Sequence, residues 1–123
     1  MPLTVLIVDD EPDVRVLVRD QLERDGRFEV VGEAADGQAA IDFVEAHRPD
    51  AVVLDLWMPV VTGLEALPTI VTRSPRTRLV VYTAATDGQA RREAIALGAH
   101  ACVIKGGALM RELPELVARL CGP

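Results

Sequence analysis

Aromatic side chains and cysteines are scarce in this sequence. Its 123 residues include two Phe, one Trp, one Tyr and two Cys. A hydrophobic core must therefore consist of Val, Leu, Ile and Ala. Cys102 and Cys121 are too few for a disulfide framework and lack the spacing of a metal site, as is typical of a reducing compartment. No long apolar run and no leader-like segment occurs, so we expect no membrane span and a cytoplasmic location.

Positive charge and glycine-rich loops are also in short supply. Thirteen Lys and Arg residues stand against 19 Asp and Glu residues, for a net charge of −6. This balance argues against direct nucleic-acid binding by this domain. No glycines have the spacing of a Walker or dinucleotide loop, which argues against a flavodoxin-like cofactor enzyme. His47 and His100 are isolated, and we expect them to be structural or solvated.

Half of the residues are apolar, and they form alternating strand-like and helix-like segments. Short apolar runs predict strands at residues 5–8, 51–54, 79–82 and 101–104, and residues 28–33 are predicted as a further strand. Helical spacing predicts a helix after each strand, with ends near Gly26, Pro49, Arg73 and Gly98. The last helix carries Leu109 to Leu120, and Pro114 either kinks it or begins it.

Five strand–helix units in one domain, residues 1–123, predict a doubly wound parallel α/β sheet with helices on both faces. Functional residues of such sheets gather at the carboxyl ends of the strands. The polar residues that follow the predicted strands are Asp9, Asp10, Asp55, Thr83 and Lys105. Each alone has an ordinary interpretation as a cap, a turn residue or a solvated lysine. Their coincidence at one edge favours a functional site.

The chemistry of this residue set points to phosphoryl transfer. Three carboxylates at neighbouring strand ends repel one another unless a cation lies among them, and their oxygen atoms suit Mg²⁺. The Lys105 ammonium and the Thr83 hydroxyl can bind the oxygens of a transferring phosphoryl group. Asp55 ends the central strand and is the best placed nucleophile.

Four motifs resemble the receiver domain of two-component response regulators, along nearly the whole chain. They are VLIVDDE at residues 5–11, DLWMP at 55–59 with GLE at 63–65, VYTA at 81–84, and VIK at 103–105. The resemblance implies a flavodoxin-like (CheY-like) five-stranded parallel sheet with strand order 2-1-3-4-5. The sequence around Asp55 and Gly63 is most similar to receivers of the LuxR/NarL type, which precede a helix-turn-helix domain.

The resemblance also implies an acceptor and a metal site. Asp55 would accept a phosphoryl group from a sensor histidine kinase or a phosphotransfer protein. Asp10, Asp55 and the backbone carbonyl of Trp57 would bind Mg²⁺, with Asp9 helping through water. The product is a conformational state, so we interpret the domain as a signalling switch that catalyses its own modification and not as an enzyme.

The family assigns the remaining site residues to phosphoryl binding and switching. Lys105 would bind a phosphoryl oxygen, and Thr83, followed by Ala84, would swing toward the phosphate and pull its loop along. That movement would repack the surface formed by the fourth helix, the fifth strand and the fifth helix.

Several positions depart from the family pattern. Cys102 replaces the aromatic residue whose rotation reports the threonine movement, and Gly106 replaces a common proline. Pro114 suggests an altered last helix and bears on a dimer through that surface. Trp57 and Ala85 occupy positions that tune access of the hydrolytic water, and bulky Trp57 predicts slow self-dephosphorylation.

The sequence is compatible with two contexts for the receiver and with one rival function. The chain is either the N-terminal domain of a longer regulator, with transcription as its output and a linker starting at residues 121–123, or a single-domain regulator. A phosphorylation-promoted homodimer is what the family suggests. The rival is a pseudo-receiver, a protein-interaction module that works without phosphate, which Cys102 and Gly106 favour.

Overall fold

The computed structural model describes residues 1–84, 86–107 and 111–122, so the predictions on Ala85, Leu109 and residue 123 lie outside the described residues. Strands and helices alternate along the chain. They are β1 (Leu3–Val8), α1 (Pro12–Asp25), β2 (Phe28–Ala34), α2 (Gly37–His47), β3 (Ala51–Asp55), α3 (Gly63–Arg73), β4 (Arg78–Thr83), α4 (Gly88–Ala96), β5 (Ala101–Ile104) and α6 (Leu113–Cys121).

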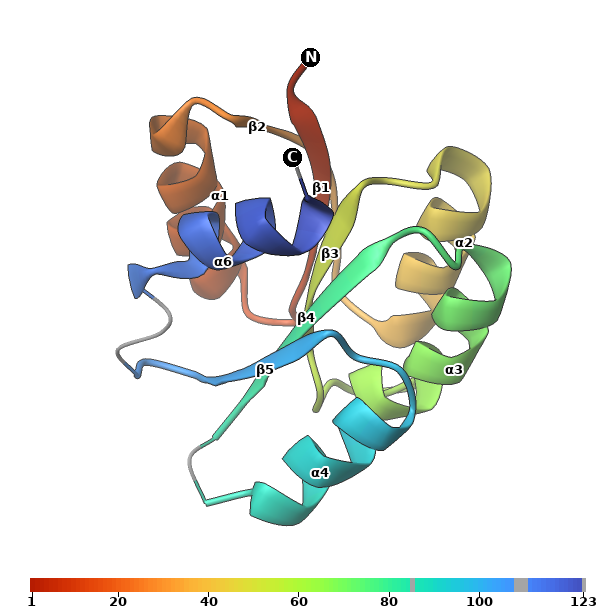
Figure 1. Ribbon diagram of the computed structural model, residues 1–123. Helices are drawn as coiled ribbons and strands as arrows, with labels where there is room; N and C mark the ends of the chain where they lie inside the picture. Colours follow the sequence, from red (N-terminus) through yellow and green to blue (C-terminus); the bar gives the residue numbers. More distant parts are fainter. Residues whose placement is uncertain (85, 108–110, 123) are drawn as a thin grey trace.

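The strands form one parallel sheet in the order β2-β1-β3-β4-β5, which confirms the predicted topology. Helices α1 and α6 cover one face of the sheet, and α2, α3 and α4 cover the other (Figure 1). Because all strands run the same way, their carboxyl ends meet at one edge. The central strand β3 lies between β1 and β4 there, so its last residue has a strand end on each side.

Side-chain alternation along the strands builds two hydrophobic cores. Leu6 and Val8 point to the layer of α2, α3 and α4, whereas Val5 and Ile7 point to α1 and α6. All four side chains are fully buried, as expected for a strand covered on both faces. The same alternation in β4 directs Tyr82 toward α1 and α6.

Local signals explain where the helices begin and end. Pro12 is the first residue of α1, and Gly26 ends that helix with a φ of 88°. Thr62 and Glu65 form a reciprocal capping box at the start of α3. Pro114 lies at the start of α6 and begins that helix instead of kinking it, because proline needs no N–H partner in a first turn.

The structure extends four of the five predicted strands by one or two residues and leaves β5 as predicted, which makes Asp55 and Thr83 the last residues of β3 and β4. Cys121, where we expect a linker to start, is the last residue of α6. Within the described residues, no helix has the length and apolarity that crossing a bilayer requires.

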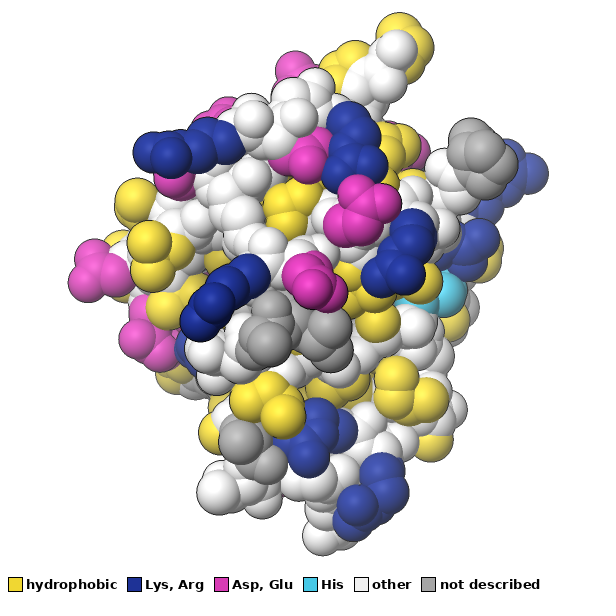
Figure 2. Space-filling view, turned by 60° about the vertical axis from the view of Figure 1, so that its left-hand side comes forward, with side chains coloured by type: hydrophobic (Ala, Val, Ile, Leu, Met, Phe, Trp, Pro, Cys, Tyr) yellow, Lys and Arg dark blue, Asp and Glu magenta, His cyan; other side chains and the backbone are white. Residues whose placement is uncertain are grey.

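On the face that carries α1 and α6, acidic and basic side chains are interspersed (Figure 2). The ion pair between Arg27 and Glu115, at 2.9 Å, is one example.

Candidate functional site

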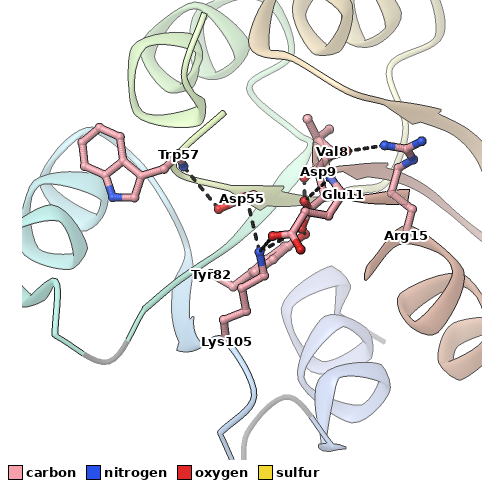
Figure 3. A network of polar contacts seen from close by, with 8 residues as sticks. All are labelled: Val8, Asp9, Glu11, Arg15, Asp55, Trp57, Tyr82 and Lys105. Atoms are coloured by element: carbon pink, nitrogen blue, oxygen red, sulfur yellow. Dashed lines mark hydrogen bonds and ion pairs between the residues drawn. The ribbon is translucent and has the colours of Figure 1, made fainter. Parts of the chain in front are cut away.

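Three of the predicted polar residues, Asp9, Asp55 and Lys105, meet at the carboxyl edge of the sheet (Figure 3). One oxygen each from Asp9, Asp10 and Asp55 lies within 4.8 Å of the others. Asp9 and Asp55 are buried, whereas Asp10 is exposed. Carboxylate oxygens that combine a buried base with an open side fit a hard divalent cation that keeps part of its water shell. The donor set therefore fits Mg²⁺, as the sequence predicts.

Asp9 is held in place by donors from three elements. Its Oδ1 accepts the Glu11 backbone N–H at 2.8 Å, and its Oδ2 accepts the hydroxyl of Tyr82. The Lys105 ammonium lies 3.4 Å from the same Oδ2. A buried carboxylate needs such donors, because burying it without them costs several kcal/mol. Asp9 thus has a fixed orientation at the base of the site.

Lys105 follows β5 and bridges the acidic residues. Its Nζ lies 3.2 Å from Glu11 Oε1 and 3.6 Å from Asp55 Oδ2, and the side chain is 28% exposed. Burial alone would lower the pKa of this ammonium, but the charges of Asp55 and Asp9 and the hydrogen bond to Glu11 together raise it. Lys105 therefore carries its positive charge at neutral pH, next to Asp55.

Asp55 is buried at the carboxyl edge of the sheet, with 4% of its surface exposed. Burial raises the pKa of its carboxyl from 3.8 to about 6; the Trp57 N–H lowers it, whereas the charge of Asp9 adds to the rise. That N–H donates to Asp55 Oδ1 at 3.2 Å, while Oδ2 faces Lys105. At neutral pH the carboxylate is mostly ionised, as a nucleophile must be.

Thr83 lies at the predicted place but does not join this network. Its side chain is 1% exposed, and among the described residues its Oγ1 is the only buried side-chain polar atom without a hydrogen-bond partner. The carbonyl of the following Ala84 accepts the Asp87 N–H at 3.1 Å. Cys102, on β5, is partly buried, which raises the pKa of its thiol.

Sequence reasoning missed four residues of this site: Glu11, Arg15, Tyr82 and Asp87. Arg15 donates to the Asp9 backbone carbonyl at 2.6 Å and pairs with Glu33. The sequence signal for Tyr82 is its position in an apolar strand, one residue before Thr83. Because side chains alternate along a strand, Tyr82 and Thr83 point to opposite faces of the sheet. Glu11 stood inside a quoted motif but received no role, and Asp87, the N-cap of α4, lies outside the quoted motifs.

Fold and site together define an α/β domain of the receiver type. The sequence model of a protein family, the response regulator receiver domain, matches residues 5–118 of this chain. A curated relative, the protein CcdB of Bacillus subtilis, is 39% identical over 96% of this chain and 97% of its own length. The signal receiver domain of NarL from Mycobacterium tuberculosis superposes with a TM-score of 0.88 at 28% identity, over 99% of this chain and 98% of that domain.

The chain belongs to the response regulator receiver family. Other relatives are much longer. A protein-glutamate methylesterase/protein-glutamine glutaminase from Rhodospirillum rubrum is 34% identical over 85% of this chain, and the match spans 27% of that protein. The matched segment is therefore one part of such a protein, and the present chain is a receiver.

Proposed function

We propose that this receiver is a phosphorylation-controlled switch that operates in the cytoplasm. Asp55 accepts a phosphoryl group from the phosphohistidine of a sensor histidine kinase or phosphotransfer protein, in a Mg²⁺-dependent reaction. The observation that carries the proposal is the convergence of Asp9, Asp10 and Lys105 around the buried Asp55. The output we infer is transcription, through a DNA-binding domain outside this chain.

The residues of the site divide the work of an in-line transfer. An oxygen of Asp55 forms the new bond to phosphorus while the bond from phosphorus to the histidine nitrogen breaks, and the nitrogen keeps the electron pair. The Trp57 N–H orients the Asp55 carboxylate through its Oδ1. Lys105 offsets negative charge on the transferred group, and the unpartnered Thr83 hydroxyl offers a donor to one of its oxygens.

The carboxylates also provide the metal site that this proposal requires. Asp10, Asp55 and the Trp57 backbone carbonyl would hold Mg²⁺, with Asp9 acting through water. When bound, the ion supplies the positive charge that makes an acidic pocket attractive to a phosphoryl group. Hydrolysis of the acyl phosphate later resets Asp55, and the domain modifies no substrate other than itself.

The test is incubation with acetyl phosphate and Mg²⁺, followed by intact mass measurement. We expect the mass of one added phosphoryl group on the parent protein, and none on Asp55→Asn or after chelation of the metal. A known receiver, labelled under the same conditions, is the positive control. If that control labels and this protein does not, the proposal is wrong.

A pseudo-receiver is the second candidate, and Cys102 is the observation that favours it. Cys102 is partly buried and occupies the position of the family's switch aromatic. The domain therefore lacks one of the side chains that transmit phosphorylation to the output surface in the family. Beryllofluoride separates the candidates. A Mg²⁺-dependent change in spectrum, or a shift in molecular mass toward a homodimer, supports the switch, whereas the absence of both supports the pseudo-receiver.

A further inference from the structure

Trp57 joins the acceptor site to the start of α4. Its backbone N–H donates to Asp55 Oδ1, and its indole Nε1 donates to Asp87 Oδ2 at 2.5 Å. In Figure 3 the indole extends away from Asp55 toward α4. Asp87 is the N-cap of α4, because its Oδ1 accepts the Ala90 N–H at 3.3 Å. One side chain thus connects the loop after β3 with the first turn of a helix 30 residues further along the chain.

Asp87 is also tied to the end of β4. The Ala84 carbonyl, one residue after Thr83, accepts the Asp87 N–H at 3.1 Å and an Arg91 guanidinium N–H at 3.1 Å. These bonds join the end of β4 to the first turn of α4. A displacement of the Thr83 backbone is therefore passed to Asp87, and Trp57 restrains Asp87 from the neighbouring loop.

The unpartnered hydroxyl of Thr83 favours a movement of this residue toward a phosphoryl group on Asp55. Its buried Oγ1 lacks a hydrogen-bond partner among the described residues. A buried hydroxyl without a partner is unfavourable, so a phosphoryl oxygen on Asp55 offers it a gain that the resting site does not. That gain favours a conformation in which Thr83, and with it Ala84 and Asp87, is displaced.

We propose that the Trp57–Asp87 hydrogen bond is a latch that holds α4 in its resting position and opens when Thr83 engages the phosphoryl group. The proposal rests on the phosphorylation of Asp55 proposed above. Asp87 acts as a positioning residue through Trp57. The latch connects the acceptor site to α4 through Trp57, in the loop after β3. In this domain β5 carries Cys102 where the family has an aromatic residue.

The latch makes a directional prediction, because it exists only in the resting state. An interaction confined to one of two conformations opposes any ligand that selects the other. Removing the bond therefore strengthens binding of beryllofluoride with Mg²⁺. A hydrogen bond to a carboxylate on a half-exposed indole predicts a gain of about three- to tenfold in apparent affinity.

The experiment compares the parent protein with Trp57→Phe and Asp87→Ser in calorimetric titrations with beryllofluoride and Mg²⁺. Phe keeps an aromatic ring but removes the indole N–H, and Ser keeps an N-cap oxygen but is too short to reach the indole. Both variants should bind more tightly, and the double variant should gain no more than either one. Gln89→Ala, in the same turn of α4, is the matched control and should bind like the parent.

Trp57 is the only tryptophan, so its fluorescence gives a second readout. Parent emission should change on beryllofluoride binding, and unliganded Asp87→Ser should already show emission close to that of the bound state. If the parent binds and both latch variants bind equally or more weakly, the latch is wrong while the proposed function stands. If the parent itself does not bind, the proposed function fails and the latch fails with it.

Discussion

Val60 occupies the left-handed region of backbone conformation although it is β-branched. Its φ is 71°, and its side chain is 87% exposed in the loop after β3. An L-residue in this region costs about 1–2 kcal/mol, and the exposed side chain recovers little of that by packing. We predict that Val60→Gly raises the free energy of unfolding by about 1 kcal/mol, which urea titration at constant m-value would measure.

Val60→Ala is the matched control for that gain. Alanine keeps the Cβ that causes the strain, so this variant should stay much closer to the parent than Val60→Gly does. If alanine and glycine stabilise equally, side-chain exposure and not the backbone is responsible.

Tyr82 contributes a single hydroxyl to the buried base of the site. It donates to Asp9 Oδ2, and burial raises the pKa of the phenol far above its ordinary value, so it stays protonated. We predict that Tyr82→Phe lowers the free energy of unfolding by about 1–3 kcal/mol, because the buried carboxylate loses one donor. Urea titrations of the single variant and of Tyr82→Phe in an Asp9→Ala background form a double-mutant cycle. Equal costs in both backgrounds would contradict a role through Asp9.

At the scale of the elements, the start of α3 packs closely against the end of β3. Gly63 is its first residue, and a Cβ there would lie 1.9 Å from the Asp55 carbonyl oxygen. No side-chain rotation relieves such a contact with backbone, so β3 must shift. We predict that Gly63→Ala lowers the free energy of unfolding by about 3 kcal/mol or more and weakens Mg²⁺ binding at Asp55.

Gly88, the first residue of α4, provides the control for Gly63. The nearest atoms to its Cβ are the flexible ends of Arg92 and Arg91, at 3.4 and 3.5 Å. Thermal unfolding should show Gly88→Ala within about 0.5 kcal/mol of the parent, since alanine also favours helix. Equal destabilisation at both positions would show that helix starts, and not the approach to Asp55, set the cost.

The elements and the site edge could be predicted from the sequence because their signals are local. A short apolar run bounded by polar residues marks every strand except β2, and Gly26 and Pro114 mark helix ends through their own backbone preferences. Parallel pairing then brings the strand ends together whatever the details of packing. For this reason the sequence alone predicts that Asp55 and Lys105 lie at one edge of the sheet.

The connections that tie the site together depend on distant parts of the chain and could not be predicted. Tyr82 and Asp9 are 73 residues apart, and Trp57 and Asp87 are 30 apart. No periodicity encodes such pairs, because they depend on the direction of side chains in the folded state. The strained φ of Val60 has no local signal either, since a β-branched residue argues against it.

On the scale of the whole molecule, the site places two carboxylates close together in the interior of a net-acidic domain, where their negative charges repel. Asp9 and Asp55 are buried side by side, and Lys105 alone among the described residues forms an ion pair with either of them. Ligands that bring positive charge to this edge should stabilise the fold, since they bind the native state only. Without them, ionisation of Asp55 costs stability.

That cost predicts how stability depends on pH. The folded pKa of Asp55, about 6, lies above its ordinary value of 3.8. The folded state therefore holds a proton that the unfolded chain releases, and the resulting stability is present below pH 3.8 and lost as the pH rises through 6. The full difference corresponds to about 3 kcal/mol. Asp55→Asn should thus gain stability over the parent by about 2 kcal/mol of that difference as the pH rises from 4.5 to 7.5, in urea titrations with a chelator. A gain independent of pH would contradict the raised pKa, and added Mg²⁺ should reduce the gain by stabilising only the parent.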